Sequence, residues 1–214
     1  MPKSSREKIV NAATEIIHQK GYHYSTVDDF LLASGVKKSN FYYHFSSKEE
    51  LALYVLDRRI LDFEENILNT TTSNLTLRPI DRLKDLFKKI SDYHASLNRE
   101  MGCPFGNLAL EMSEGNEGFR KRLSRFFNSW EESIGNCIRD GIEAGEFRDD
   151  IDPKTTATLI LSQIEGAILL VKTHKKLDPL LKVGDFILSL IKSNSKESSA
   201  IKKQNMNAEA TNNV

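Results

Sequence analysis

Apolar residues recur three or four positions apart along most of the chain, which is the pattern of amphipathic helices. The first such segment ends at Gly21, a residue that commonly terminates helices. Its apolar face consists of Ile9, Val10, Ala13, Ile16 and Ile17. No segment shows the sustained two-residue alternation of a half-buried strand. The pattern therefore predicts an all-α protein.

The helices that follow are predicted to differ in length and to be separated by short polar turns. Ser25 and Thr26 each precede an aspartate by three residues, which is the capping-box spacing at a helix start. A polar loop is expected over 69–76, and Asp152-Pro153 suits the first turn of a helix. The expected helices cover about 26–33, 38–44, 47–69, 78–97, 104–113, 117–144, 153–175 and 178–193.

Charge divides the chain into unlike parts, although 30 Lys and Arg balance 30 Asp and Glu over its 214 residues. Residues 1–48 carry a net charge of +3, residues 49–194 carry −4 and residues 195–214 carry +1. We predict a basic domain over 1–50, a larger helical domain over 51–194 and a disordered tail over 195–214. The polar N-terminus, the two cysteines and the lack of about 18 consecutive apolar residues lead us to expect a cytoplasmic protein that does not span a membrane.

The two short helices and their connection suit a helix-turn-helix. Gly35 permits a sharp turn, and the apolar side chains of Val27, Phe30 and Val36 can fill the angle between the helices. In such a motif the second helix presents polar side chains to base edges in the major groove of DNA. The residues that meet this need are Lys37, Lys38, Ser39 and Asn40.

A run of landmarks over about 6–55 resembles the N-terminal signature of the TetR/AcrR family of transcriptional regulators. The landmarks are Gly21-Tyr22, Ser25-Thr26-Val27, Ala33-Ser34-Gly35-Val36, Phe41-Tyr42-Tyr43-His44-Phe45 and Lys48-Glu49-Glu50-Leu51. The chain departs from the family pattern at Phe30-Leu31-Leu32, which is bulkier, and at Asn40, which replaces a small Thr or Ser. The resemblance implies phosphate contacts by Thr26, Tyr42, His44 and Lys48, and base reading by residues 37–40 with Tyr43. Helical spacing instead assigns Phe41 and Phe45 to the core.

The same resemblance implies a homodimer that binds a pseudo-palindromic, double-stranded DNA operator. The last two helices would form the interface, and their apolar sets are broader than a one-sided surface helix needs. Burial within one chain could account for part of those sets. The expected interface residues are Ile160, Ile164, Ala167, Ile168, Val183, Phe186, Ile187 and Leu190.

A ligand cavity in the second domain is also implied by the resemblance, with a small-molecule inducer as its occupant. Candidates for its lining are aromatic residues and residues with a polar group on an apolar face, although for each aromatic taken singly ordinary core is the favoured alternative. The candidates are Tyr93, Cys103, Phe105, Asn107, Glu111, Phe127, Trp130 and Gln163. We expect His18 and His23 to lie on the surface, and no His or Cys spacing resembles a zinc site.

Cys103 is the one candidate for covalent sensing of a thiol-reactive electrophile or oxidant, because it lies near the start of a predicted helix, where the helix dipole favours thiolate. The alternative is that it is a small buried residue, as free cysteines usually are. The sequence predicts a ligand-responsive DNA-binding regulator, most simply a repressor, with no cofactor or metal and no catalytic motif. The competing hypothesis is a helical interaction protein, or an enzyme, whose helix-turn-helix does not read DNA.

Overall fold

The structure, a computed structural model, describes residues 4–97 and 101–193 of the chain. Within these residues it contains nine α-helices and one π-helical segment, and no strand beyond a single β-bridge between Phe147 and Lys192. The predicted all-α fold is confirmed. The predicted tail over 195–214 lies outside the described residues. The α-helices are α1 (Ser5–Lys20), α2 (Val27–Ser34), α3 (Lys38–His44), α4 (Lys48–Phe63), α5 (Pro79–Ser96), α6 (Pro104–Met112), α7 (Glu117–Glu143), α8 (Pro153–His174) and α9 (Asp178–Ile191).

Local hydrogen bonds explain where the first helices begin and end. Thr26 caps α2, because its hydroxyl accepts from the backbone N–H of Asp29 while the Asp29 carboxylate accepts from the N–H of Thr26. Ser4 and Glu7 form the same reciprocal pair at the start of α1. Gly35, which follows α2, has a φ of 65° and a ψ of 19°, a left-handed conformation that glycine adopts without steric cost.

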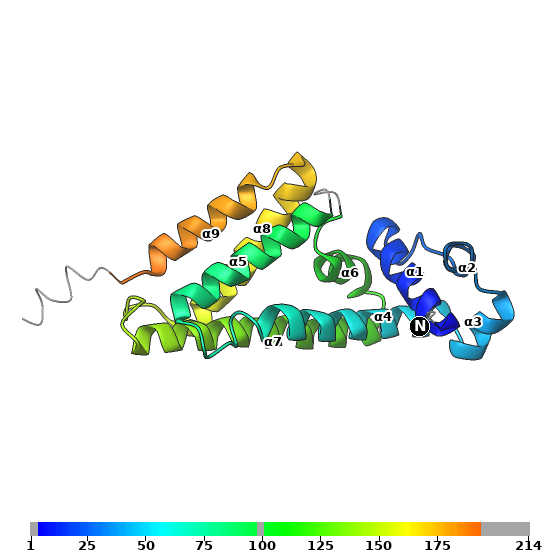
Figure 1. Cartoon of the computed structure of the whole chain (residues 1–214), viewed down its shortest axis with the longest axis horizontal. Coiled ribbons are helices and arrows are strands. Elements are labelled where there is room, and N and C mark those ends of the chain that lie inside the picture. The colour runs from blue at the N-terminus through cyan, green and yellow to red at the C-terminus, as the bar shows by residue number, and fades with distance from the viewer. Residues whose placement is uncertain (1–3, 98–100, 194–214) are drawn as a thin grey trace, which may run out of the picture.

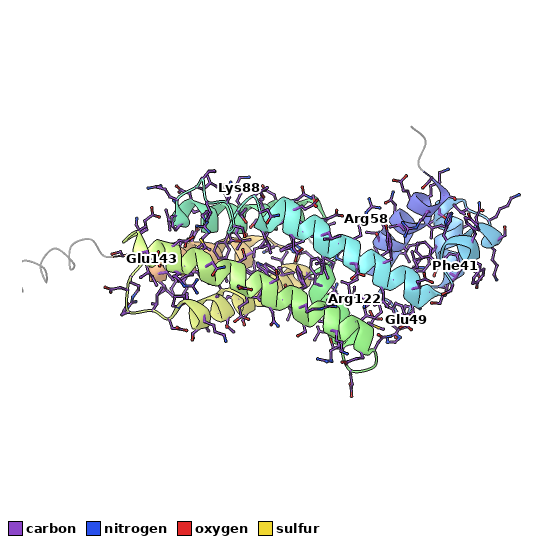
Figure 2. The ribbon with its side chains drawn as sticks, turned by 90° about the horizontal axis from the view of Figure 1, so that it is seen from below. Phe41, Glu49, Arg58, Lys88, Arg122 and Glu143 are labelled. Carbon is purple, nitrogen blue, oxygen red and sulfur yellow. The ribbon has the colours of Figure 1, made fainter. Side chains whose placement is uncertain are left out.

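The helices form an elongated molecule with α1, α2 and α3 gathered at one end (Figure 1). Helices α4 and α7 run side by side from that end toward the other, where α5, α8 and α9 pack together, and α6 lies between the two groups (Figures 1 and 2). Polar cross-links join the long pair: Asn116 donates to Glu49 at 2.9 Å, and Arg122 pairs with Asp57 at 2.8 Å. The first three helices are thus connected to the rest of the molecule through a continuous helical strut.

The long predicted helix over 47–69 is in fact two segments. Helix α4 ends at Phe63, and the chain continues as a π-helical segment, η1 (Glu64–Leu68). A π-helical turn closes its hydrogen bonds over five residues and widens the helix, and such turns occur frequently at functional sites. Phe63 and Ile67, at and beyond this junction, both line the cavity described below.

The turn after α7 packs so closely on that helix that only glycine fits at position 141. A Cβ at Gly141 would lie 2.0 Å from the ring of Phe147. The same turn is joined to the end of α9, since Arg148 donates its N–H to the Ile191 carbonyl and Ser193 donates to the Glu146 carbonyl, both at 2.9 Å. These contacts hold the end of α9 against the turn that follows α7.

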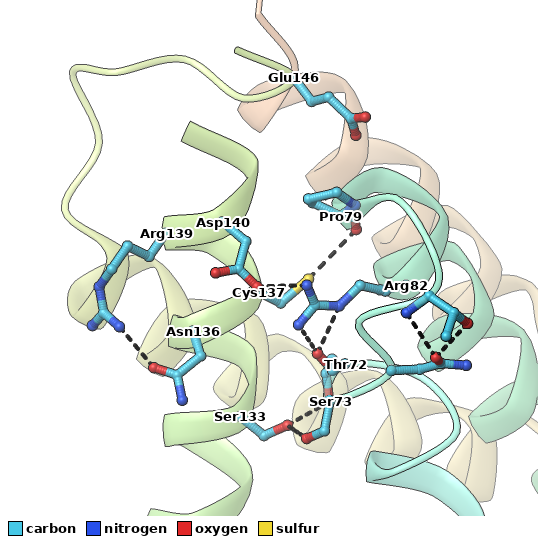
Figure 3. A network of polar contacts seen from close by, with 12 residues as sticks. Thr72, Ser73, Pro79, Arg82, Ser133, Asn136, Cys137, Arg139, Asp140 and Glu146 are labelled. Atoms are coloured by element: carbon cyan, nitrogen blue, oxygen red, sulfur yellow. Dashed lines mark hydrogen bonds and ion pairs between the residues drawn. The ribbon is translucent and has the colours of Figure 1, made fainter. Parts of the chain in front are cut away.

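A buried polar network joins α5, α7 and the connection between η1 and α5 (Figure 3). The Arg82 side chain is 3% exposed; its Nε donates to the Thr72 carbonyl at 2.8 Å and its Nη1 pairs with Asp140 at 2.6 Å. The hydroxyls of Thr72 and Ser73 both bond to Ser133 of α7. Each of these polar side chains therefore has a hydrogen-bond or ion-pair partner, which offsets the free-energy cost of removing it from water.

Candidate nucleic-acid interface and ligand cavity

The first three helices enclose a small aromatic core that sets the angle between α2 and α3. Phe30 and Phe41 are fully buried, and Phe45 is nearly so. The rings of Phe41 and Phe45 are 6.1 Å apart, and the guanidinium of Arg6 covers Phe45 and Tyr54 from outside. The prediction that Phe41 and Phe45 are core residues is confirmed.

Because Phe41 points inward, the residues of α3 other than Phe41 and the half-buried His44 point outward. Tyr43 is 82% exposed and Tyr42 is 52% exposed. The four polar residues from Lys37 to Asn40 are exposed as well. Within the part of the chain that the structure describes, neither these four side chains nor those of Tyr42 and Tyr43 have a hydrogen-bond partner. The outward face of α3 consists of Lys37, Lys38, Ser39, Asn40, Tyr42 and Tyr43.

The three other predicted DNA contacts are engaged within the chain. Thr26 caps α2, and the His44 ring nitrogen Nε2 lies 3.0 Å from the Ser5 hydroxyl. Lys48 donates to the carbonyls of Tyr22 and Ser25 at 2.7 and 2.8 Å, and its ammonium lies 4.1 Å from the Tyr22 ring centroid. Lys48 therefore holds the α1–α2 connection against the start of α4, with one of its three donors left for a phosphate.

Two adjoining cavities, each of about 360 Å³, lie where α1 meets the larger helical domain. The first is enclosed by α1, α4, η1, α5, the start of α6, α7 and α8, and the second lies between α1 and α6. Thr14, His18, Arg59 and Pro104 line both. Helix α1 of the helix-turn-helix end is thus a wall of both cavities. The other residues of the first cavity include Phe63, Ile90, Tyr93, His94, Cys103, Phe105, Trp130 and Ile168.

The predicted ligand residues divide into three groups. Tyr93, Cys103, Phe105 and Trp130 line the first cavity, whereas Asn107 and Glu111 line the second. Two predictions are wrong in placement: Gln163 is exposed on α8, and Phe127 packs beside Phe126, so neither lines these cavities. Phe127 follows the inward-facing Phe126 by one residue, about 100° around the helix.

Three polar residues that line the cavity were not predicted as ligand residues: His18, Arg59 and His94. His18, expected on the surface, is only 6% exposed, and its Nε2 lies 3.0 Å from the Gly102 carbonyl. His94 is 3% exposed. Arg59 donates to the Thr14 carbonyl at 3.1 Å. The apolar stretch Ile16-Ile17 before His18 signals a buried helix face, but it does not show what the histidine faces.

Burial determines the chemistry of Cys103. Its Sγ accepts from the backbone N–H of Gly106 at 3.3 Å at the start of α6, as the helix-dipole argument supposed. Burial nevertheless raises the pKa of the Cys103 thiol well above its usual range, and the neighbouring Glu165 acts in the same direction. The protonated form of the thiol is therefore favoured, and this is the less reactive form. Burial raises the pKa of Cys137 to about 12, and this cysteine packs in the core.

Glu111 connects α6 to the helix-turn-helix. Its two carboxylate oxygens accept from the backbone N–H groups of Tyr22 and His23 at 2.8 and 2.6 Å. A Cβ at Gly21 would lie 2.8 Å from the same carboxylate. Phe105 in the first turn of α6 lines the cavity, and Glu111 near its last turn holds the α1–α2 connection. A shift of α6 would therefore reach both places.

Replacing Glu111 with Ala should release the α1–α2 connection without unfolding the protein. The amide protons of Tyr22 and His23 lose their acceptor, so we expect them to exchange with solvent at least about tenfold faster. Hydrogen exchange resolved by residue measures this. Glu114→Ala, at an exposed position after α6, is the matched control and should leave both rates unchanged. Equal exchange in both variants would mean that Glu111 does not hold the connection.

Acid should weaken the fold through the two buried histidines. Burial lowers the pKa of His18 and of His94 to about 4, from 6.5. The unfolded chain therefore binds more protons than the folded one between pH 6.5 and pH 4, and stability falls as pH falls through that range. From pH 7 to pH 5.5 we expect the pair to lower the free energy of unfolding by about 2 kcal/mol. Urea denaturation at each pH measures the loss.

Two variants test whether the buried histidines, and not carboxylates, cause this loss of stability. His94→Leu removes one of the two groups, and we expect it to abolish about half of the pH-dependent loss. His174→Gln, an exposed histidine at the end of α8, should leave the pH dependence as it is in the wild type. A His94→Leu variant with the full wild-type slope would show that other groups cause the loss.

Helices α8 and α9 leave a large apolar face uncovered. Its apolar side chains are between 44% and 62% exposed: Leu159 and Leu170 on α8, and Phe186 and Leu190 on α9. Leu169 and Leu181 are exposed as well, but helical spacing turns them about 100° or more away from these residues. Gly166 lies on the exposed side of α8 with open space around its Cα. By length and composition α8 would also qualify as a membrane-spanning helix, but one such helix is weak evidence of a membrane segment, and 39% of that window is buried inside the fold.

The predicted interface residues fall on both sides of these helices. Phe186 and Leu190 lie on the uncovered face, and Val183 is half-buried. The other five are buried within the protomer and are unavailable to a partner, which corrects the prediction. These are Ile160, Ile164, Ala167, Ile168 and Ile187. Helix α8 carries apolar residues on two sides. The interface residues predicted on this helix lie on its buried side, and α8 packs against α7 within the protomer.

A helix-turn-helix with a free outward face, set on a larger helical domain with a cavity, defines a helix-turn-helix transcriptional regulator. The chain belongs to the TetR family: residues 9–55 match the model for bacterial regulatory proteins of the tetR family, and residues 79–185 match the tetracyclin repressor-like C-terminal domain. Its relatives include the HTH-type transcriptional repressor DhaR of Mycobacterium sp. (strain GP1), 32% identical over 82% of this chain and 86% of that one. The regulator LmrA of Bacillus subtilis is 29% identical over 88% and 97%. The regulatory protein TetR from Rhodobacter sphaeroides superposes with a TM-score of 0.81 at 27% identity, covering 87% of this chain and 98% of that structure.

Proposed function

We propose that this DNA-binding regulator is a cytoplasmic repressor that releases its operator when a small molecule enters the cavity beside α1. The observation that supports DNA reading most directly is the outward face of α3, where polar and aromatic side chains lack partners within the described residues. Lys37 to Asn40 and Tyr43 would read bases, and Tyr42 would contact a phosphate. Thr26, His44 and Lys48 would contact phosphates from the positions where their internal hydrogen bonds hold them.

The uncovered apolar face of α8 and α9 supports a homodimer. Exposed apolar surface of this extent on two adjacent helices is costly in water unless a partner covers it. Two copies meeting through this face would form a four-helix bundle around Phe186 and Leu190, with Gly166 allowing close approach. The two α3 helices could then enter successive major grooves of a pseudo-palindromic operator.

Release follows from the position of α6. A molecule that enters the first cavity contacts Phe105, and a displaced α6 moves Glu111 and with it the connection between α1 and α2. A ligand acts only through the difference between its affinities for the two arrangements. We propose a non-covalent ligand and not a thiol-reactive electrophile, because burial keeps the Cys103 thiol protonated. No catalytic step is proposed, since the sequence has no catalytic motif.

Operator binding can be tested on DNA from the region upstream of the protein's own gene. A protein that neutralises phosphates should lose affinity steeply with salt, with a slope of about −0.9 per phosphate contacted. Asn40→Ala and Lys38→Ala should change the sequence preference, whereas Tyr42→Phe should weaken all sequences alike. Lys84→Ala, on α5 and far from α3, is the control. Failure to bind this DNA at low salt would favour the alternative, a helical protein whose helix-turn-helix does not read DNA.

A further inference from the structure

We propose that the two adjoining cavities take one small organic carboxylate, with its apolar body in the first cavity and its carboxylate where the cavities meet. The carboxylate would lie among Arg59, Lys172 and His18. This inference rests on the proposed function, because it names the class of molecule that the regulatory cavity would sense.

The first cavity supplies an apolar wall. Phe63, Phe105 and Trp130 lie along one side, with the Phe63 ring 4.7 Å from that of Trp130 and 5.5 Å from that of Phe105. Ile90 and Ile168 extend this wall. Largely apolar walls with a few polar groups are typical of small-molecule sites, and about 360 Å³ lies within their size range. The apolar part of a ligand therefore belongs on this side.

The junction of the cavities is positively charged. No carboxylate among the described residues lies within ion-pair distance of Arg59 or Lys172, whereas Lys20, Arg82 and Arg122 each have one. Arg59 lines both cavities and Lys172 lines the second. The Lys172 side chain also lies over Gly102, whose carbonyl bonds to His18, so the ammonium is close to that ring.

The acidic residues nearby do not neutralise this junction. Glu111 uses both carboxylate oxygens on the N–H groups of the α1–α2 connection. Glu15 and Asp62 are exposed, at the rim of the first cavity. Glu165 is buried beside Cys103, and burial raises its pKa toward the neutral form. An anion at the junction would therefore meet two cations, while the nearby carboxylates are bonded to backbone N–H groups, exposed at the rim, or buried where the charged form is disfavoured.

His18 adds a third group. Its Nε2 bonds to the Gly102 carbonyl and must donate there, so Nδ1 is the free position of the neutral ring; Nδ1 is buried and has no partner among the described residues. Burial lowers the His18 pKa most, and the positive charges of Arg59 on α4 and Lys172 on α8 lower it further; His94 on α5 acts in the same direction only when it is protonated. A bound carboxylate reverses that environment and favours a proton on Nδ1.

The fluorescence of Trp130 offers a direct test, because this is the only tryptophan of the chain and it lines the cavity. The probes are octanoate and 3-phenylpropanoate, each compared with its uncharged primary amide. We expect both carboxylates to change the fluorescence saturably and each to bind at least about tenfold more tightly than its amide. Equal binding of acid and amide, or no saturable change with any probe up to millimolar concentration, would overturn the proposal.

Two matched variants test whether the preference for the carboxylate depends on the charge of Lys172 or on any positive charge near the end of α8. Lys172→Gln should lose most of the preference for the carboxylate over the amide, with amide binding unchanged. Lys176→Gln removes the same charge from an exposed position that lines neither cavity, and it should bind both probes as the wild type does. If both variants keep the full preference, the carboxylate does not lie at the junction.

The outcome is distinguishable from that of the proposed function. Operator binding is measured on the same preparations without any probe. Operator binding together with no carboxylate preference would overturn this inference alone, whereas carboxylate binding without operator binding would overturn the repressor and leave the carboxylate site standing.

Discussion

Replacing Phe186 with Glu should convert the protein to a monomer and lower its affinity for the operator by at least about a hundredfold. Phe186 is 62% exposed on the uncovered face of α8 and α9. In the proposed bundle two copies of the new carboxylate would be buried close together without a cationic partner, which is strongly unfavourable. A monomer has only one α3 helix with which to bind the operator, and bivalent binding typically raises affinity by a factor of about 10² to 10⁴.

Sedimentation and DNA titration measure the two parts of this prediction separately. Leu75→Glu is the matched control, because Leu75 is 79% exposed on the connection before α5, away from the proposed interface. The control should keep both the dimer mass and the operator affinity. A Phe186→Glu protein that still sediments as a dimer would place the interface on another surface.

Replacing Asp140 with Asn should destabilise the protein by about 3 kcal/mol. This change leaves the positive charge of Arg82 buried without its carboxylate, although the Thr72 carbonyl still accepts from it. Removal of one partner from a fully buried pair costs about 3–5 kcal/mol, and the 39% exposure of the Asp140 side chain places the cost at the lower end. Urea denaturation measures the change in the free energy of unfolding.

The double variant Arg82→Met/Asp140→Leu shows whether the uncompensated charge is the cause. Both polar groups are then replaced by apolar ones, and we expect much of the lost stability to return, because apolar replacements of buried pairs are often close to neutral. Asp150→Asn is the control at the surface, where the ion pair with Arg148 is exposed. If Asp140→Asn unfolds at the same urea concentration as the wild type, the hydrogen bonding of Arg82 to the Thr72 carbonyl is enough to stabilise the buried guanidinium, and the ion pair contributes nothing.

Local signals in the sequence were sufficient for the helices and for the helix-turn-helix. The Thr26–Asp29 capping box, the left-handed Gly35 and the inward spacing of Phe41 and Phe45 each act within a few residues of their own position, so a pattern of neighbours predicts them. The switch from α4 to the π-helical η1 was not predictable in this way. Its apolar spacing resembles that of a continuing helix.

The interface and the cavity depend on contacts between distant segments, and there the prediction was partial. Helix α8 is apolar on two sides, and periodicity alone does not show that Ile160 and Ile164 face α7 while Leu159 faces outward. His18 and Arg59 are brought together by the packing of α1 against α4, and neither belongs to a recognisable motif. The helix-dipole argument for Cys103 was local and correct in geometry, but burial outweighs it.

The position of α1 as a shared wall has a thermodynamic consequence for the DNA itself. Thr14 and His18 belong to the DNA-reading end and also line both cavities, so any ligand that weakens operator binding must itself be bound more weakly by the operator complex, and by the same factor. Operator DNA is then an antagonist of the ligand. Added operator DNA should therefore raise the ligand concentration that half-saturates the protein.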